Sequence, residues 1–255
     1  MEWIEPRWPA PAQVQALCTT RVGGASSGPY ASLNLADHVG DDPACVARSR
    51  RLLSERLHLP GEPLWLRQVH GCELARGGVD PVGCEADAAM AAGPGLVCAV
   101  LTADCLPLLL CDRAGTRVAA VHAGWRGLAA GVIEAAVAGI QADPADLLAW
   151  LGPAIGPDAF EVGEEVRATF VGQDPGAACA FRPSPAGRWL ADIYRLARRR
   201  LGALGVDQVY GGDLCTFSDR GRFFSYRRDG VTGRMASLIW TTGSSDRLPV
   251  GPEAA

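Results

Sequence analysis

The chain has 255 residues, 48% of them hydrophobic, and a formal net charge of -4 at pH 7. This length and composition are enough for a substantial core and predict one domain that covers residues 1–255. The weakly acidic charge provides no basic surface for a phosphate backbone and excludes nucleic acid as an expected partner. The nine cysteines are not closely paired, so they do not predict the disulfide framework of a small secreted protein.

No targeting or membrane-spanning segment is expected. Residues 1–6 lack the basic and apolar regions of a secretory signal. The most apolar stretch, residues 96–110, is too short to cross a bilayer and is interrupted by Thr102, Asp104 and Cys105. These features predict a soluble, cytoplasmic protein.

The first half of the chain alternates apolar runs with turns that are rich in glycine. Asp42 has the character of a helix N-cap and Pro43 follows it at the first helical position, so a helix is expected from there to about Pro60. Residues 71–83 have a loop-like composition. Strands are expected at residues 14–19, 64–69, 96–101, 106–110 and 117–123.

In the second half, a glycine-rich turn at residues 124–127 leads into a helix that is expected to reach Ile140. Two further helices are expected at residues 164–171 and 190–204, the second with an apolar face and Gly205 as its C-cap. This mixture of strands and helices predicts an α+β fold with mixed sheets in place of a regular βαβ repeat. The remaining expected elements are strands at residues 147–151, 206–210, 223–226 and 235–240, and a loosely ordered tail at residues 241–255.

His70, Cys105 and His122 are the strongest candidates for a functional site. Each lies at the end of an apolar run that is expected to be a buried strand, where a rigid sheet can present side chains to a ligand. Two imidazoles and one thiolate match the three protein ligands of a catalytic zinc ion, and the chain contains no Cys-x-x-Cys pair of the structural zinc type. The sequence therefore favours an open zinc site, although spacing alone does not show that three distant residues converge.

The same residues are compatible with a different chemistry. Cys105 could act as a nucleophile, with His122 as its base and Asp104 or Asp87 orienting the imidazole. This arrangement would make the protein a cysteine hydrolase that acts on an amide bond. His38 lies in a polar loop and is a candidate for a supporting position beside either kind of site.

Three arginines occur where a guanidinium could hold a phosphate. Arg21 lies next to a glycine-rich turn, Arg67 lies close to His70, and Arg126 stands at an expected helix start. Guanidinium groups at such positions can bind an anion through two parallel hydrogen bonds. The glycine-rich turn matches neither a Walker A loop nor a dinucleotide-binding fingerprint, so nucleoside triphosphates and NAD are not expected ligands.

Nine segments give the chain a resemblance to a known family. In single-letter code they are TRVGG (20–24), SLNL (32–35), GDDP (40–43), RQVHG (67–71), ADA (86–88), TADCLP (102–107), VHAGWRG (121–127), LGPAIG (151–156) and FSYRRDGVTGR (224–234). Together they resemble the bacterial YfiH-like, or laccase-domain, family, once described as multi-copper polyphenol oxidoreductases and now associated with zinc-dependent purine nucleoside phosphorylase activity. Ala36 departs from the family pattern, which usually has glycine there.

The resemblance implies an α+β fold with mixed β-sheets packed face to face and flanked by helices. It implies zinc (Zn2+) held by His70, Cys105 and His122, and phosphorolysis of adenosine, inosine, guanosine and methylthioadenosine, with some adenosine deamination. Proton transfer is expected from Asp87 or Asp104. The enzyme is expected to be a monomer or small homo-oligomer without nucleic acid or membrane partners. Contacts to the substrate or to phosphate are expected at Arg21, Asn34, Arg67, Gln68 and Arg126.

Copper chemistry and known deaminase scaffolds do not fit this chain. Its four histidines are too few for several copper centres that each need two or three imidazoles, so a laccase is excluded. The His-x-Glu and Pro-Cys-x-x-Cys signature of cytidine deaminases is absent, so any deamination uses a different scaffold. A non-catalytic nucleoside-binding module with a structural metal stays an alternative, and the family's link to peptidoglycan-precursor editing is neither supported nor excluded.

Overall fold

The computed structural model describes residues 1–243. One group of strands comprises β1 (Trp3–Ile4), β2 (Val14–Thr19), β3 (Pro63–Leu64), β6 (Val97–Thr102) and β14 (Met235–Thr241). A second group comprises β4 (Leu74–Arg76), β5 (Ala88–Ala92), β7 (Leu106–Asp112), β8 (Arg117–Ala123), β9 (Leu147–Leu151) and β13 (Gln208–Gly211). A third comprises β10 (Glu161–Val162), β11 (Phe181–Ser184) and β12 (Arg188–Ala191). The helices are α1 (Pro43–Leu57), α2 (Trp125–Ala130), α3 (Val132–Ile140), α4 (Glu164–Gln173), α5 (Ile193–Ala203) and α6 (Tyr226–Asp229).

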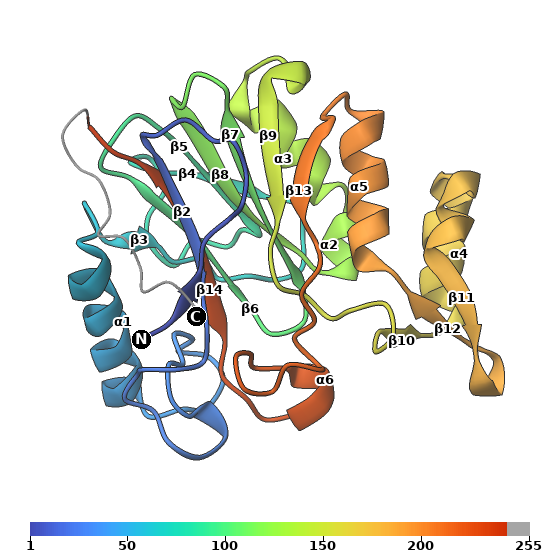
Figure 1. Ribbon diagram of the computed structural model, residues 1–255, viewed down its shortest axis with the longest axis horizontal. Helices are drawn as coiled ribbons and strands as arrows, with labels where there is room; N and C mark the ends of the chain where they lie inside the picture. The colour runs from blue at the N-terminus through green and yellow to red at the C-terminus, as the bar shows by residue number, and fades with distance from the viewer. Residues whose placement is uncertain (244–255) are drawn as a thin grey trace.

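The strands form two large sheets and one small sheet (Figure 1). The order is β1-β2-β14-β6-β3 in the five-stranded sheet, β13-β9-β7-β8-β5-β4 in the six-stranded sheet, and β10-β12-β11 in the small sheet. Both large sheets combine parallel and antiparallel pairs. The predicted α+β class, with mixed sheets packed face to face and flanked by helices, is therefore confirmed.

An inner core lies between the two large sheets. Leu109, Val118 and Ala120 of the six-stranded sheet pack there against Val100 and Ile239 of the five-stranded sheet. The residues between them along each strand face the other way, because successive side chains of a strand point to opposite faces. Since both faces are buried, β7 and β8 are almost continuous apolar runs in the sequence.

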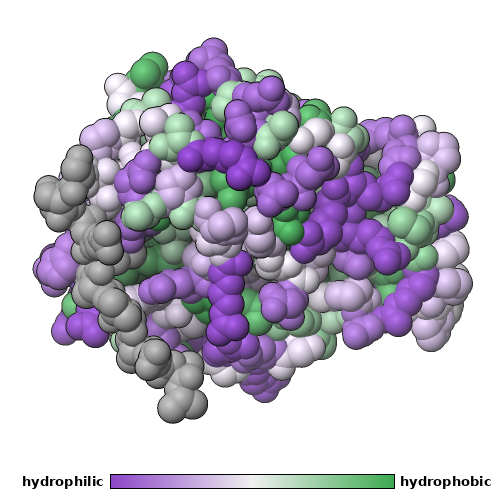
Figure 2. All heavy atoms as spheres, turned by 45° about the horizontal axis from the view of Figure 1, so that its top comes forward, coloured by the Kyte–Doolittle hydropathy of each residue, from purple (hydrophilic) through white to green (hydrophobic). Residues whose placement is uncertain are grey.

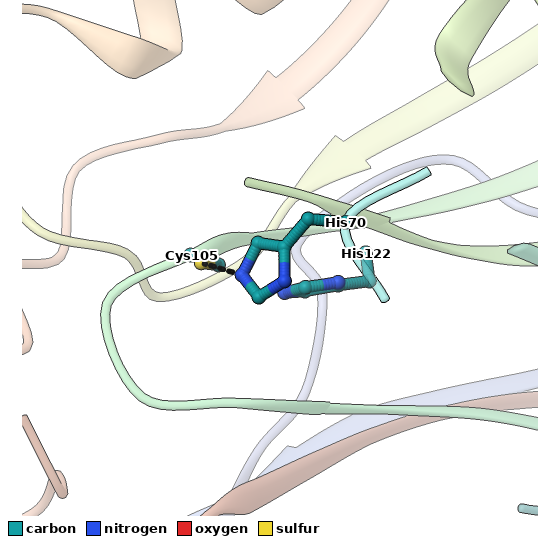
Figure 3. A group of neighbouring side chains, drawn as sticks. All are labelled: His70, Cys105 and His122. Carbon is teal, nitrogen blue, oxygen red and sulfur yellow. Dashed lines mark hydrogen bonds between the residues drawn. The ribbon is translucent and has the colours of Figure 1, made fainter. Parts of the chain in front are cut away.

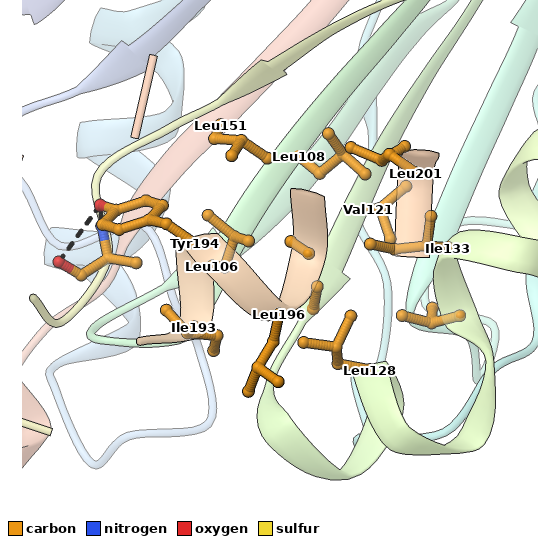
Figure 4. Close-up of a cluster of buried hydrophobic side chains, with 14 of the residues drawn as sticks. Leu106, Leu108, Val121, Leu128, Ile133, Leu151, Ile193, Tyr194, Leu196 and Leu201 are labelled. Carbon is orange, nitrogen blue, oxygen red and sulfur yellow. Dashed lines mark hydrogen bonds between the residues drawn. The ribbon is translucent and has the colours of Figure 1, made fainter. Parts of the chain in front are cut away.

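Helices cover the outer faces of the two large sheets. On the six-stranded sheet, Leu108 and Val121 pack against Ile133 of α3 and Leu201 of α5 (Figure 4). On the five-stranded sheet, α1 contributes Leu53 to a separate buried cluster. Each sheet is thus covered on both sides, which makes a rigid support for the loops at the strand ends.

Several elements form where the sequence places them. The strands β2, β8 and β9 have the predicted bounds. Asp42 is the N-cap of α1, and its carboxylate accepts a hydrogen bond from the backbone N–H of Ala44 at 2.8 Å. Pro43 is the first residue of that helix, where the missing N–H of proline costs nothing.

The prediction of a strand at residues 64–69 was wrong beyond Leu64, where β3 ends. Past that point, the side-chain amide of Gln68 takes the position of a neighbouring strand. It accepts a hydrogen bond from the N–H of Leu101 at 2.7 Å and donates one to the carbonyl of Leu101 at 2.8 Å. The backbone N–H groups of the following residues are used by a buried carboxylate, as described below, so the ladder does not continue.

Two predicted helices have different bounds. The helix expected up to Ile140 is broken into α2 and α3 at Gly131, whose φ of 100° is in the left-handed region. The helix expected at residues 190–204 begins only at Ile193, because Asp192 caps it through a bond to the N–H of Arg195. The residues before that cap belong to strand β12 instead.

Two further expectations were wrong, and one strand was not expected. Residues 223–226 are no strand, although Phe223 and Phe224 are fully buried, and the chain enters α6 at Tyr226. Residues 71–83 contain the short strand β4, and β5 was missed because its sequence, AAMAA, has no β-branched or aromatic residue. The tail expected at residues 241–255 lies outside the described residues from position 244 onwards.

The surface is mostly polar on the face shown in Figure 2, where hydrophobic side chains appear in small separate patches. Among the described residues, no helix combines the length and the apolar character needed to cross a bilayer.

Candidate metal centre and adjoining pocket

His70, Cys105 and His122 converge at one end of the six-stranded sheet (Figure 3). Their potential ligand atoms all lie within 4.8 Å of one another. The Sγ atom of Cys105 is 3.7 Å from Nε2 of His70, and the two imidazole rings meet edge to face with centroids 4.7 Å apart. The convergence expected from the sequence is therefore present in the structure.

Strand pairing brings two of the three residues together. In the antiparallel pair β7 and β8, Pro107 lies opposite His122, and Cys105 immediately precedes β7. The thiol and the imidazole thus lie at the same end of one hairpin. The neighbouring pair, Ala88 of β5 opposite Val121 of β8, places the residue before Ala88 beside His122 as well.

That residue, Asp87, connects the third candidate to the hairpin. Its fully buried carboxylate accepts a hydrogen bond from Nδ1 of His122 at 2.7 Å. It also accepts from the backbone N–H groups of Val69, His70 and Gly71 at 3.1, 2.9 and 2.7 Å. One carboxylate therefore fixes the ring of His122 and the backbone that carries His70.

Close approach of the three side chains depends on a glycine. A Cβ atom on Gly124 would lie 2.8 Å from Cδ2 of His70 and 3.0 Å from Sγ of Cys105. His70 itself has a φ of 63°, a conformation that few residues other than glycine adopt. The backbone around the site is thus shaped to bring the imidazole and the thiol together.

The electrostatics of the site favour a thiolate next to a charged imidazole. Burial alone would raise the pKa of the Cys105 thiol, but the charge and hydrogen bonds of His122 and His70 outweigh it and lower this pKa to about 6. Burial would lower the pKa of His122, but the negative charges of Cys105 and Asp87 raise it above its ordinary value. A thiolate is the form of cysteine that binds metals and also the form that attacks an electrophile.

The donor set fits a zinc ion. Because Nδ1 of His122 bonds to Asp87, its Nε2 is the nitrogen left for a metal. Zinc bonds of about 2.0 Å to nitrogen and 2.3 Å to sulfur in tetrahedral geometry place ligand atoms roughly 3.3 to 3.8 Å apart, close to the spacing of Cys105 and His70. A carboxylate behind a metal-binding imidazole is also a common arrangement, since it fixes the ring. Three protein ligands leave a fourth position open.

A pocket of about 490 Å³ adjoins this centre. Its volume is in the range of small-molecule sites. The side chains around it include the three candidate ligands, several aromatic groups and several arginines. They are His38, Gln68, His70, Leu101, Thr102, Ala103, Asp104, Cys105, His122, Trp125, Arg126, Ile155, Phe160, Ile193, Tyr226, Arg227 and Arg234.

Three residues selected from the sequence, Gln68, Arg126 and His38, line the pocket. The amide of Gln68 is engaged with the backbone of Leu101 on both sides, so it supports the wall. The guanidinium of Arg126 lies over the ring of Trp125, 4.4 Å from its centroid. The imidazole of His38 is 55% exposed, which places it at the rim.

Three other predicted contact residues do not line the pocket. Arg21 donates from Nε to the carbonyl of Ala31 at 2.9 Å, and its guanidinium lies over the ring of Phe224. Arg67 is 70% exposed and pairs with Glu85. Both arginines were selected for their neighbours in sequence, but their side chains turn towards local partners in the fold.

Asn34 is also absent from the pocket, because it is fully buried and serves the backbone. Its Nδ2 donates to the carbonyl of Ala36 at 2.9 Å and to the carboxylate of Asp41 at 2.9 Å. Its Oδ1 accepts from the N–H of Arg234 at 3.0 Å. Asn34 therefore fixes the backbone of the segment before β14 without contacting the pocket.

Asp104 lines the pocket but is occupied by structural contacts. One carboxylate oxygen accepts from the hydroxyl of Thr216 at 2.6 Å, and the other accepts from the backbone N–H of Arg227 at 2.6 Å. Its φ of 94° is unusual for a residue other than glycine. The carboxylate thus ties the turn before Cys105 to the distant turn of Thr216 and to helix α6, and its predicted part in proton transfer stays a prediction.

The sequence reasoning missed two of the three arginines and most of the aromatic residues of the pocket. Arg227 and Arg234 come from the segment 224–234, which was noted as a motif without a role for its arginines. Phe160 comes from a loop and Tyr226 from the start of α6, and the position of both next to the site depends on the tertiary fold. The only signal in the sequence was the density of arginine, glycine and aromatic residues in that one segment.

Comparison with known proteins places the chain in a family. A family model described as multi-copper polyphenol oxidoreductase laccase matches residues 15–242. The chain belongs to this family, as its resemblance to YfiH-like, laccase-domain proteins implied.

The particular relatives carry a different name. The chain is 58% identical over 239 residues to a purine nucleoside phosphorylase of Pseudomonas aeruginosa, covering 93% of this chain and 98% of that protein. It is 54% identical over 238 residues to the purine nucleoside phosphorylase YfiH of Escherichia coli K12, with the same two shares. These relatives show that its close homologues are named as enzymes.

Solved structures agree with the fold. A crystal structure of a Neisseria meningitidis protein matches with a TM-score of 0.92 and 49% identity, over 95% of this chain and 100% of that one. The structure of YlmD from Geobacillus stearothermophilus matches with a TM-score of 0.88 and 31% identity, over 95% and 97% of the two chains.

Proposed function

We propose that this chain is a zinc-dependent purine nucleoside phosphorylase. It would cleave adenosine, inosine, guanosine and methylthioadenosine with phosphate, and deaminate some adenosine. The observation that carries the proposal is the convergence of His70, Cys105 and His122 beside a pocket of about 490 Å³. The relatives named as purine nucleoside phosphorylases supply the reaction class. Its substrates would be small molecules, and it would act in the cytoplasm without nucleic acid or membrane partners. The chain would form one domain and would be a monomer or a small homo-oligomer.

In this proposal, the metal centre would hold zinc and the pocket wall would hold the purine base. When bound, zinc would act as a Lewis acid at the open fourth position. Asp87 would hold His122 in the tautomer that turns Nε2 towards the metal. A purine base would stack on aromatic side chains of the wall, for which Trp125 and Phe160 are suited, because a base presents a flat π-face.

The nucleophile and the sugar require charged and polar groups near the centre. Arg126 has a guanidinium at the pocket and would offset the charge of phosphate. Asp104 is held at the pocket wall next to Cys105, and we propose that it or Asp87 accepts or returns the proton of the reaction. Arg21, Asn34 and Arg67, which point elsewhere, have no part in this proposal.

Phosphate dependence tests the proposal. Inosine should be converted to hypoxanthine and ribose 1-phosphate only when phosphate is present, and purified protein should contain about one zinc per chain, as a three-ligand site requires. Ribose as the product at saturating phosphate would identify a hydrolase and contradict the phosphorylase. No turnover of any of the four nucleosides would favour a binding module.

A cysteine hydrolase is the second candidate, and one observation favours it. Asp87, His122 and Cys105 form a continuous chain of contacts in which the pKa of the thiol is lowered to about 6. A carboxylate, an imidazole and a thiolate in this order are the parts of a nucleophilic cysteine site, here acting on an amide such as a cell-wall precursor. The presence of a second imidazole, His70, at 3.7 Å from the same sulfur favours the metal over this alternative.

A further inference from the structure

Three arginines face the pocket without a carboxylate partner. Arg126 is the second residue of α2, Arg227 lies in α6, and Arg234 immediately precedes β14. In the described part of the chain, none of the three forms an ion pair, although other arginines do. The three guanidinium groups therefore line the pocket without a carboxylate at ion-pair distance.

Arg234 is held rigidly by backbone groups. Its Nη1 donates to the carbonyls of Thr232 and Gly233 at 2.9 and 3.0 Å, and its own N–H donates to the buried Asn34. Among the described residues, neither its Nε nor its Nη2 has a hydrogen-bond partner. The guanidinium is thus fixed in position while part of its donor fork is unused.

The surroundings of Arg234 place it next to the proposed centre. Burial lowers the pKa of this guanidinium, and the negative charges that act against that effect are those of Cys105 and Asp104. Its guanidinium carbon is 5.8 Å from the centroid of the Tyr226 ring, which also lines the pocket. A half-buried cation in this position interacts strongly with an anion, because little water screens it.

Arg227, seven residues before Arg234 in the same segment, also lines the pocket. Its Nη1 donates to the carbonyl of Glu161 at 2.7 Å, and its guanidinium carbon is 5.6 Å from the centroid of the Phe160 ring. Its backbone N–H is held by Asp104, the residue adjacent to Cys105. The same carboxylate that shapes the thiol turn therefore also positions this arginine.

We infer that Arg234 and Arg227, together with Arg126, form an oxyanion subsite beside His70, Cys105 and His122, and that this subsite binds inorganic phosphate. The inference rests on the proposed phosphorolysis and assigns the phosphate to residues other than Arg21 and Arg67. A fixed guanidinium with free donors suits the bidentate recognition of a phosphate.

Direct binding tests the subsite without turnover. Isothermal titration of the purified protein with inorganic phosphate should give an affinity that falls about tenfold or more in Arg234→Gln, because charge-assisted hydrogen bonds are lost. Arg234→Lys should fall between the two, since it keeps the charge and loses the fork. The matched control is Arg48→Gln, which removes the same charge from an exposed position on α1 and should bind like the parent. Circular dichroism and thermal melting verify that each variant is folded.

Steady-state kinetics separate the subsite from the proposed function. With inosine as substrate, Arg234→Gln should raise the KM for phosphate at least tenfold and change the KM for inosine little. Equal phosphate binding in Arg234→Gln and Arg48→Gln would overturn the subsite. If the parent bound phosphate through Arg234 but never cleaved inosine, the proposed function would fail while the subsite stood. A loss of affinity for inosine 5′-monophosphate, without any loss for inorganic phosphate, would reassign the arginines to a nucleotide and overturn the inference.

Discussion

Asp87→Asn is the most informative single change in this structure. The two carboxylate oxygens are fully used, since Oδ1 accepts from His122 and His70 and Oδ2 accepts from Val69 and Gly71. An asparagine has the same shape, but its amide nitrogen can replace only one oxygen and accepts no hydrogen bond. If the amide nitrogen faces Val69 and Gly71, two part-buried N–H donors lose their acceptor. If it faces His122, the ring can change its tautomer, and the N–H of His70 is then the donor without an acceptor.

The expected magnitude follows from these contacts. A buried donor left unsatisfied costs about 1 to 3 kcal/mol, so one or two of them predict a loss of about 1 to 6 kcal/mol in the free energy of unfolding. The zinc affinity should fall about 10- to 100-fold, the usual cost of removing the partner of a metal-binding imidazole. If the amide nitrogen faces His122, the ring must also change its tautomer and carry the proton on Nε2, where the metal would bind.

Two assays and a matched control separate the two effects. Urea unfolding measures the stability, and competition with a chromogenic chelator measures the zinc affinity. The control is Asp112→Asn, because Asp112 is also buried and accepts from the N–H and hydroxyl of Thr116 and the N–H of Arg117. It lies at the other end of β7, so it should lose stability and keep the parental zinc affinity. Parental zinc affinity in folded Asp87→Asn would refute the reasoning.

Four further predictions concern the thiol, the proton balance, the metal and the glycine at the centre. Iodoacetamide should label Cys105 slowly in zinc-loaded protein and much faster after chelation, as followed by mass spectrometry, whereas fast labelling of the loaded form would support the hydrolase. The pKa of Cys105 is lowered to about 6 and that of His122 is raised to about 9, so between these values the centre holds a thiolate and an imidazolium. Zinc binding at pH 7.5 should therefore release about one proton, from His122. Titration calorimetry in buffers of different ionisation enthalpy measures the number of protons released, and a value of zero would contradict the prediction. Chelation should lower the melting temperature, since at a free zinc concentration 100 times Kd the ion contributes about 2.7 kcal/mol to the folded state; equal melting curves would argue against a resident ion. Gly124→Ala should weaken zinc binding, because its Cβ would meet His70 and Cys105 at 2.8 and 3.0 Å, while Gly172→Ala, in an open position on α4, should not; equal affinities by chelator competition would speak against the close approach.

The sequence predicts the part of the site that depends on strands. Cys105 and His122 flank apolar runs that are buried on both faces, and such runs are recognisable without any tertiary information. Their pairing in one hairpin follows from the short connection between β7 and β8. The position of these two residues was therefore accessible from local patterns.

The rest of the site depends on contacts between distant segments. The expected strand before His70 does not continue, because Gln68 and Asp87 replace its ladder by side-chain hydrogen bonds. Arg234 is placed through Asn34, a residue 200 positions earlier in the chain. No local pattern encodes such contacts, and Arg21, selected from its sequence neighbours, does not line the pocket for the same reason.

Two buried carboxylates explain how loops acquire fixed positions around a rigid hairpin. Asp87 accepts the backbone N–H groups of the loop that carries His70, and Asp104 accepts the backbone N–H of Arg227. Asp104 additionally accepts from the hydroxyl of Thr216. The contacts made by main-chain N–H groups do not depend on the side chains of the residues that donate them. Val69 illustrates this, because its N–H is bound to Asp87 while the residue as a whole is 45% exposed. The geometry of the centre therefore rests on two carboxylates that lie next to the ends of strands, and the side chains of the residues they anchor are free to serve the ligand.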